Sequence, residues 1–208
     1  MPIIDLTVPL TSSLVIWPGE QGLRVRTLRS FPKDSVHVSQ ISMGAHTGTH
    51  LDAPMHFLLK GAPLEKVSLD CLVGRCRVLR LNLGGRKEVE VEDLKPFKIQ
   101  PGERLLFNLG NSRHLFARKF YQDYVAMGDQ AAKFLAVKKT KLVGVDYLSV
   151  ERRGNPGHPV HVSLLKAGTA IVEGLNLSGV KPGTYTLVCL PLRMVGVEAS
   201  PVRAVLMR

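Results

Sequence analysis

His46-Thr-Gly-Thr-His50-Leu-Asp52-Ala-Pro-Met-His56 is the stretch around which the rest of the chain is organised. It brings three of the seven histidines and one aspartate into a short segment. Imidazole and carboxylate groups bind transition metals, and imidazole also moves protons near neutral pH. This combination favours a metal or acid/base site over a polar surface turn.

The local sequence predicts a strand that runs into a short helix. If residues 46–50 are extended, His46 and His50 point to the same face, because alternate side chains of a strand share a face. A helix would also align these two histidines, but the threonines and glycine between them are poor helix formers. Pro54 suits a first helical turn and Gly61 its end. We expect the four groups to gather at this junction.

The donor atoms favour a catalytic metal site. Three protein ligands and an open position are typical of catalytic zinc, whereas four ligands usually form a structural site. His46, His50 and Asp52 would supply two nitrogens and one oxygen, a set that suits Zn or Mn. The second half of the chain offers four candidates to complete the site: Asp146, His158, His161 and Glu173. The sequence alone leaves open which of these four approach the first cluster.

The composition indicates one globular domain over residues 1–208, long enough to bury a full core. The sequence contains no apolar run as long as a membrane span. The first residues lack the basic and then apolar pattern of a signal peptide. The three cysteines form no C-x-x-C pair, which argues against a disulfide framework or a thiolate metal site. We therefore expect a cytoplasmic protein without a membrane partner.

The formal net charge of +11 raises the question of nucleic-acid binding. The basic residues are spread along the chain, and their densest groups are short and lack interleaved aromatic residues. Proteins that bind single strands use such aromatic residues for stacking. We therefore expect solvated basic faces, no nucleic-acid partner, and some attraction of anionic substrates.

Alternating apolar residues and turn residues predict a series of strands. The predicted strands are 3–8, 23–30, 36–43, 76–83, 104–108, 141–146, 170–172, 185–190 and 202–207. The predicted helices are 129–137 and 162–166, with helical turns within 88–94 and 112–124. A helix followed by a buried strand indicates a parallel element, so these patterns predict an α/β fold with a mixed sheet.

The quoted stretch resembles the H-x-G-T-H-x-D-x-P-x-H signature of the metal-dependent cyclase/hydrolase family, which contains the bacterial kynurenine formamidases and isatin hydrolases. The block His161-Val-Ser-Leu-Leu-Lys-Ala-Gly-Thr-Ala-Ile-Val-Glu173-Gly-Leu-Asn-Leu177 is similar to a second motif of that family. Trp17-Pro-Gly and Val143-Gly-Val-Asp146 match the family in kind and order. The resemblance spans the whole chain, and its first motif is highly specific.

The resemblance implies a swivelling β/β/α fold in a single domain, usually oligomeric, with one or two divalent metals, Zn or Mn. His46, His50 and Asp52 would hold the first metal. Asp52 would bridge to a second metal held by His161 and Glu173. A homodimer or homotetramer is expected.

His56 would be the general acid/base in this family. A neutral imidazole can take a proton from an attacking water and return it to a leaving nitrogen. A role for His56 as a further metal ligand is the competing interpretation. Trp17, read from its neighbours alone, is more simply a hydrophobic plug over the core, but the resemblance places it in the substrate pocket. Glu20 departs from the aspartate that the family often has after Trp-Pro-Gly.

The function implied by the resemblance is hydrolysis of a C–N amide bond by a metal-activated water. The expected substrate is N-formylkynurenine, which would make the protein an arylformamidase of tryptophan degradation. One alternative is ring-opening hydrolysis of a cyclic amide such as isatin. The other is a catalytically silent protein that binds a metal or ligand.

Overall fold

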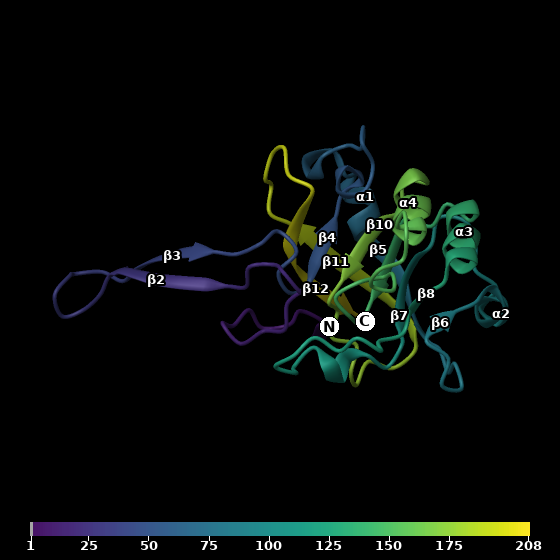
Figure 1. The fold of residues 1–208 in the computed structure, drawn as a ribbon, viewed down its shortest axis with the longest axis horizontal. Helices are drawn as coiled ribbons and strands as arrows, with labels where there is room; N and C mark the ends of the chain where they lie inside the picture. The colour runs from purple at the N-terminus through teal and green to yellow at the C-terminus, as the bar shows by residue number, and fades with distance from the viewer. Residues whose placement is uncertain (1) are drawn as a thin grey trace.

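A barrel-like mixed sheet forms the centre of the fold in the computed structural model, which describes residues 2–208 (Figure 1). Its strands, in spatial order, are β1 (Ile3–Asp5), β12 (Ala199–Met207), β11 (Gly183–Pro191), β5 (Val73–Arg80), β7 (Arg104–Asn108), β9 (Leu142–Val145), β10 (Ala170–Glu173) and β4 (His50–Asp52). An additional pairing between β12 and β4 joins the two sides of the sheet. The sheet therefore closes on itself, and β4 lies where it closes.

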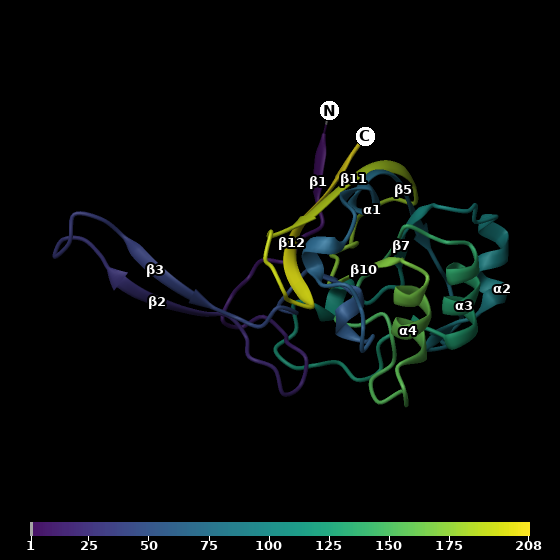
Figure 2. The ribbon, with the colours of Figure 1, turned by 90° about the horizontal axis from the view of Figure 1, so that it is seen from above.

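The strands β5, β7, β9 and β10 are parallel to their neighbours within this group, and the other pairings are antiparallel. On β7, Leu106 packs into the interior of the barrel, whereas Leu105 and Phe107 pack against the helices α3 (Asp129–Val137) and α4 (Pro159–Lys166). These helices lie together along the outside of the parallel strands (Figure 2). The predicted swivelling β/β/α fold with a mixed sheet is confirmed.

The remaining elements are short. They are the helices α1 (Leu69–Leu72) and α2 (Val91–Leu94), the 3-10 helices η1 (Pro54–His56), η2 (Leu64–Lys66), η3 (Lys95–Phe97) and η4 (Ser112–His114), and the paired strands β6 (Glu88–Val89) and β8 (Ala126–Met127). The prediction of a strand and a helical turn within 88–94 is confirmed by β6 and α2. Within 112–124, the helical part is the single turn η4.

A long arm projects from the barrel (Figures 1 and 2). It consists of the antiparallel strands β2 (Arg24–Arg29) and β3 (Val38–Ser42), and every residue of both strands is exposed. The two predicted strands therefore exist, but they form a ribbon separate from the main sheet. Its large exposed apolar side chains are Val25, Leu28, Phe31, Val36, Val38 and Ile41.

The structure corrects the prediction for the histidine-rich stretch from His46 to His56. A strand was expected over residues 46–50, but β4 begins only at His50, and a turn precedes it. Gly48 causes the difference, because its φ of +75° is left-handed and ends an extended conformation. The expected helix from Pro54 to Gly61 is a single 3-10 turn, η1.

Other strand boundaries also differ. The strand predicted over 3–8 ends at Asp5, although an isolated bridge joins Thr7 to Leu175 further along. The strand predicted over 76–83 is shifted to Val73–Arg80. The helix predicted over 162–166 starts earlier, at Pro159. Residues 104–108 and 129–137 match their predictions.

Cys71, Cys76 and Cys189 are free thiols, in agreement with the absence of a disulfide framework. Among residues 2–208, no helix combines the length and the apolar character needed to cross a membrane.

Candidate functional site

In the stretch from His46 to Asp52, two of the candidate side chains lie on a strand and one lies in the turn before it. His50 and Asp52 belong to β4, where His50 is the direct cross-strand partner of Glu173 on β10. The Gly48 carbonyl lies 2.9 Å from Nδ1 of His50, so Nδ1–H donates to it and Nε2 is left facing the site. A Cβ at position 48 would lie 2.5 Å from Cδ2 of Leu10, so glycine is needed for space as well as for conformation.

The structure brings together all five side chains that the resemblance marks as metal ligands. Nδ1 of His46 lies 3.1 Å from Oδ1 of Asp52, and Nε2 of His50 lies 3.5 Å from both Oδ1 of Asp52 and Oε2 of Glu173. His161, on α4, completes the cluster with Nε2 3.2 Å from Oε1 of Glu173. Residues more than a hundred positions apart in sequence therefore meet at one end of the barrel.

The charges of this cluster balance one another. Burial opposes charging of His50 and His161, but the neighbouring carboxylates raise the pKa of His50 to about 9 and that of His161 to about 10. Burial likewise opposes ionisation of Asp52 and Glu173, yet the imidazoles hold the pKa of each carboxyl below its usual value. The carboxylates are thus anionic at neutral pH, in the state that a cation requires.

The hydrogen bonds of the cluster are incomplete. Both carboxylate oxygens of Asp52 and the Nε2 atoms of His46 and His50 are buried and have no hydrogen-bond partner. Buried polar groups are nearly always paired, so these four atoms without partners indicate that a partner is missing. Imidazole nitrogens with carboxylate oxygens are the donors of Zn and Mn sites. The residues therefore fit a divalent metal ion.

The donor atoms form two overlapping groups. His46, Asp52 and His56 can bring their ligand atoms within 4.8 Å of one another, and so can His50, Asp52 and Glu173. Asp52 belongs to both groups, which suits a carboxylate that bridges two ions. The grouping differs from the assignment by resemblance, which pairs His46 with His50 and gives His56 no ligand role.

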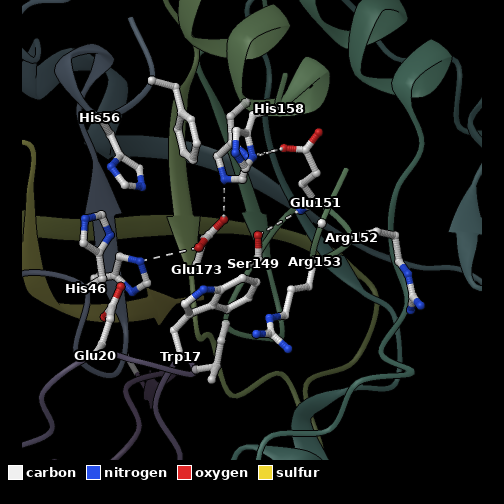
Figure 3. A pocket seen from close by; sticks show the side chains of 15 residues that line it. Trp17, Glu20, His46, His56, Ser149, Glu151, Arg152, Arg153, His158 and Glu173 are labelled. Carbon is white, nitrogen blue, oxygen red and sulfur yellow. Dashed lines mark hydrogen bonds and ion pairs between the residues drawn. The ribbon is translucent and has the colours of Figure 1, made fainter. Parts of the chain in front are cut away.

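His56 faces the cluster from the turn η1. Its ring centroid lies 4.1 Å from that of His46, and the two rings are tilted by 35°. Burial lowers the pKa of His56 to about 4, so its imidazole is neutral near pH 7. In Figure 3 it points toward the same space as His46 and lies across the pocket from Arg153. It can therefore accept a proton from a molecule held beside the cluster.

Glu151 is a functional residue that sequence reasoning missed. Nδ1–H of His161 donates to Oε2 of Glu151 at 2.7 Å, while Oε1 accepts from the Val160 amide at 2.9 Å and from Asn155 at 3.0 Å. Glu151 and His161 also form a possible metal-binding group with His158, but these hydrogen bonds already satisfy the carboxylate. Glu151 therefore orients His161, and only its position in the folded loop reveals this role.

Two of the four candidates from the second half of the chain, Asp146 and His158, do not belong to this cluster. Asp146 is buried and accepts hydrogen bonds from the Leu109, Asn111 and Ser112 amides, so it fixes the loop after β7 and lies outside the pocket lining. His158 lines the pocket at its exposed rim, with its side chain 51% accessible.

A pocket opens above the cluster (Figure 3). Its remaining wall contains Trp17, Phe57, Leu148 and Ser149, and its rim carries the charged side chains of Glu20, Arg152 and Arg153. The indole of Trp17 packs edge-on against Phe120 at 5.1 Å between centroids. Trp17 is thus both packed against neighbouring residues and part of the pocket wall.

Comparison with known proteins identifies the family of this chain. A family model described as a putative cyclase matches residues 4–152, which is more than half of the chain. The chain belongs to the cyclase family. A kynurenine formamidase of Geobacillus thermodenitrificans is 34% identical over 206 residues, covering 99% of this chain and 97% of the relative.

Several solved structures share the fold of this chain. A potential metal-dependent hydrolase with cyclase activity has a TM-score of 0.86 and 33% identity, covering 99% of this chain and 96% of its own. Isatin hydrolase A from Labrenzia aggregata, bound to benzyl benzoate, also has a TM-score of 0.86, at 21% identity, with coverage of 99% and 93%. At that identity the likeness supports the fold alone.

Proposed function

We propose that this cyclase-family protein is a metal-dependent amide hydrolase, and that it removes the formyl group of N-formylkynurenine as an arylformamidase. The observation that carries the proposal is the buried cluster of histidines and carboxylates at the base of an open pocket. The similarity to kynurenine formamidases over nearly the full length supports the choice of substrate and a role in tryptophan degradation.

We assign the metal ligands by combining the geometry with the resemblance. His46, His50 and Asp52 would hold a first ion, Zn or Mn, and His161 and Glu173 would hold a second, with Asp52 shared between them. Divalent ions in such a site make water acidic enough to attack a carbonyl carbon, and they also polarise that carbonyl. The proposal requires at least one ion and is strengthened by the shared position of Asp52.

His56 is assigned the proton transfers. Its neutral imidazole takes a proton from the attacking water as a bond forms to the formyl carbon. It then gives that proton to the amide nitrogen as the C–N bond breaks, which releases formate and the arylamine. Trp17 supports the aromatic body of the substrate along the pocket wall.

Assembly, domain structure and location extend this proposal. The exposed apolar residues of the arm support a homodimer or homotetramer, because an isolated two-stranded ribbon is barely stable in water. The continuous barrel supports one hydrolase domain over residues 1–208. Free, largely buried thiols support a reducing cytoplasm.

The deciding experiment measures formate released from N-formylkynurenine by purified protein supplied with Zn or Mn, beside ring opening of isatin. Release of formate that is abolished by chelation is the expected result. Faster opening of isatin would assign the cyclic-amide activity instead. Metal and ligand binding with no turnover of either compound would show a catalytically silent member of the family.

A further inference from the structure

The rim of the pocket carries a positively charged side chain, Arg153, whose position is explained neither by the packing of the fold nor by the cluster of histidines and carboxylates. Arg153 lies in the loop between β9 and α4, and its side chain is exposed. In Figure 3 this side chain extends beside Trp17, on the opposite side of the pocket from His56. A substrate that reaches from the cluster along the indole would therefore end near the guanidinium group.

The surroundings of Arg153 leave its charge unmatched. Among residues 2–208, no carboxylate oxygen lies within 4.0 Å of its guanidinium nitrogens. Its guanidinium lies over the ring of Phe120 at 5.9 Å and donates one long hydrogen bond, 3.4 Å, to Gln122. An aromatic face holds an arginine in place without neutralising it, so its remaining donors are available to a ligand.

The guanidinium group of the adjacent Arg152, in contrast, is held by contacts within the protein. Its guanidinium donates to the Tyr124 carbonyl at 2.5 Å and lies over the Tyr124 ring at 5.4 Å. In Figure 3 it points away from Trp17. Arg152 therefore serves the packing of its loop, and Arg153 alone of the pair is placed to meet a molecule beside Trp17.

A negative charge on the other side of the rim makes the two ends of the pocket electrostatically different. Glu20 lines the pocket on the side of His46, as Figure 3 shows. A carboxylate on the substrate would be repelled by Glu20 and attracted by Arg153. Guanidinium groups bind carboxylates in a bidentate manner, which adds orientation to affinity. The two rim charges thus distinguish the two ends of the pocket for an anionic ligand.

We propose that Arg153 determines specificity by binding a carboxylate that the amide substrate carries at the far end of its aromatic body from the scissile bond. This inference rests on the proposed amide hydrolase function, and it names the substrate class as carboxylate-bearing aryl amides. Neutral amides and lactams would bind without this contact.

A binding experiment tests the inference independently of turnover. Trp17 is the single tryptophan of the chain and lines the pocket, so its emission reports on a bound ligand. Kynurenine and its carboxamide, which lacks the carboxylate charge, are titrated into the metal-loaded protein while Trp17 emission is followed. We expect kynurenine to bind about tenfold or more tightly than the carboxamide, the size of one charged hydrogen-bonding contact.

Three variants complete the test. Arg153→Gln should remove the preference for kynurenine and leave carboxamide binding within about twofold, and Arg153→Lys should restore part of the preference. Arg113→Gln removes the same charge from an exposed arginine outside the pocket lining and should behave as the wild type. Equal binding of both ligands by the wild type, or an equal loss of both in Arg153→Gln, would overturn the inference. Formate release from N-formylkynurenine, measured in parallel, judges the hydrolase function separately.

Discussion

Glu151 fixes the imidazole of His161, since its Oε2 accepts the Nδ1–H hydrogen bond at 2.7 Å while Nε2 of the same ring lies 3.2 Å from Glu173. This pairing keeps a proton on Nδ1, so Nε2 is the ring nitrogen that faces the site and that a metal ion would deprotonate on binding. Carboxylates that orient a metal-binding histidine in this way raise its basicity and hold its ring in position.

Replacing Glu151 by Gln should therefore weaken metal binding by about 10- to 100-fold, because a neutral amide orients His161 less firmly. Isothermal titration with Zn measures the effect. His158→Ala is the matched control, because His158 lies 3.5 Å from the same carboxylate but at the exposed rim. An equal loss of affinity in His158→Ala would mean that Glu151, His158 and His161 bind an ion themselves.

Metal removal should lower stability as well as activity, because the two buried oxygens of Asp52 then have no partner. At a metal concentration a thousand times the dissociation constant, binding contributes about 4 kcal/mol, or roughly 8–16 °C in melting temperature for a chain of this size. Thermal unfolding before and after chelation, with metal content by mass spectrometry, tests this. An Asp52→Asn variant that kept the full metal-dependent increase in melting temperature would contradict the assignment of Asp52.

His56→Ala should reduce kcat by about 10²- to 10⁴-fold, the range for loss of a general acid/base, while the bound metal is retained. Metal content and kcat are measured on the same preparation. Loss of the metal together with activity would instead make His56 a ligand, as its grouping with His46 and Asp52 allows. His56→Gln, which keeps a polar group but cannot transfer the proton in the same way, should resemble the alanine variant.

Gly174→Ala should destabilise the protein by about 1–3 kcal/mol and weaken metal binding. Gly174 has φ +70°, and a Cβ there would lie 2.5 Å from the Gly48 carbonyl oxygen, which belongs to the turn before β4. Gly179→Ala is the matched control, because Gly179 has φ +76° but nothing within 4 Å of the added atom. Equal melting temperatures for the two variants would show that backbone conformation alone, without the contact to Gly48, accounts for the effect.

Ile41→Glu should weaken self-association about tenfold or more, because an unpaired charge would enter a surface that we propose to be covered by another copy. Ile41 pairs with Val25 across the arm, and both are exposed. Gln40→Glu adds the same charge on the other face of β3 and is the control. Light scattering across a concentration series gives the mass of each form. A wild-type mass equal to one chain would reject the oligomer.

Sequence patterns could predict which candidate side chains gather where those side chains are close together in the chain. The spacing of His46, His50 and Asp52 was informative because three donors within seven residues cannot lie far apart. His161 and Glu173 needed a family resemblance, since no periodicity reports that β4 and β10 pair in the register Glu173 opposite His50. The role of Glu151 depends on the path of a loop, which single-sequence patterns do not contain.

The same distinction applies to the fold. Residues 104–108 and 129–137 were predicted correctly because their periodicity and end signals agree. The strand expected over 46–50 was wrong because Gly48 adopts a left-handed conformation, which the alternation of residues does not predict. The arm was predicted as two strands, but its separation from the sheet depends on tertiary packing.

The position of β4 also bears on how the protein is made. During synthesis from the N-terminus, residues 50–52 emerge long before both of their pairing partners, Ala170–Glu173 and Ala199–Met207. Residues 50–52 therefore have no strand to pair with until nearly the whole chain has left the ribosome. Such late, long-range pairing slows folding. Metal binding by the complete set of proposed ligands would then follow the synthesis of nearly the whole chain and would indicate that the barrel has closed.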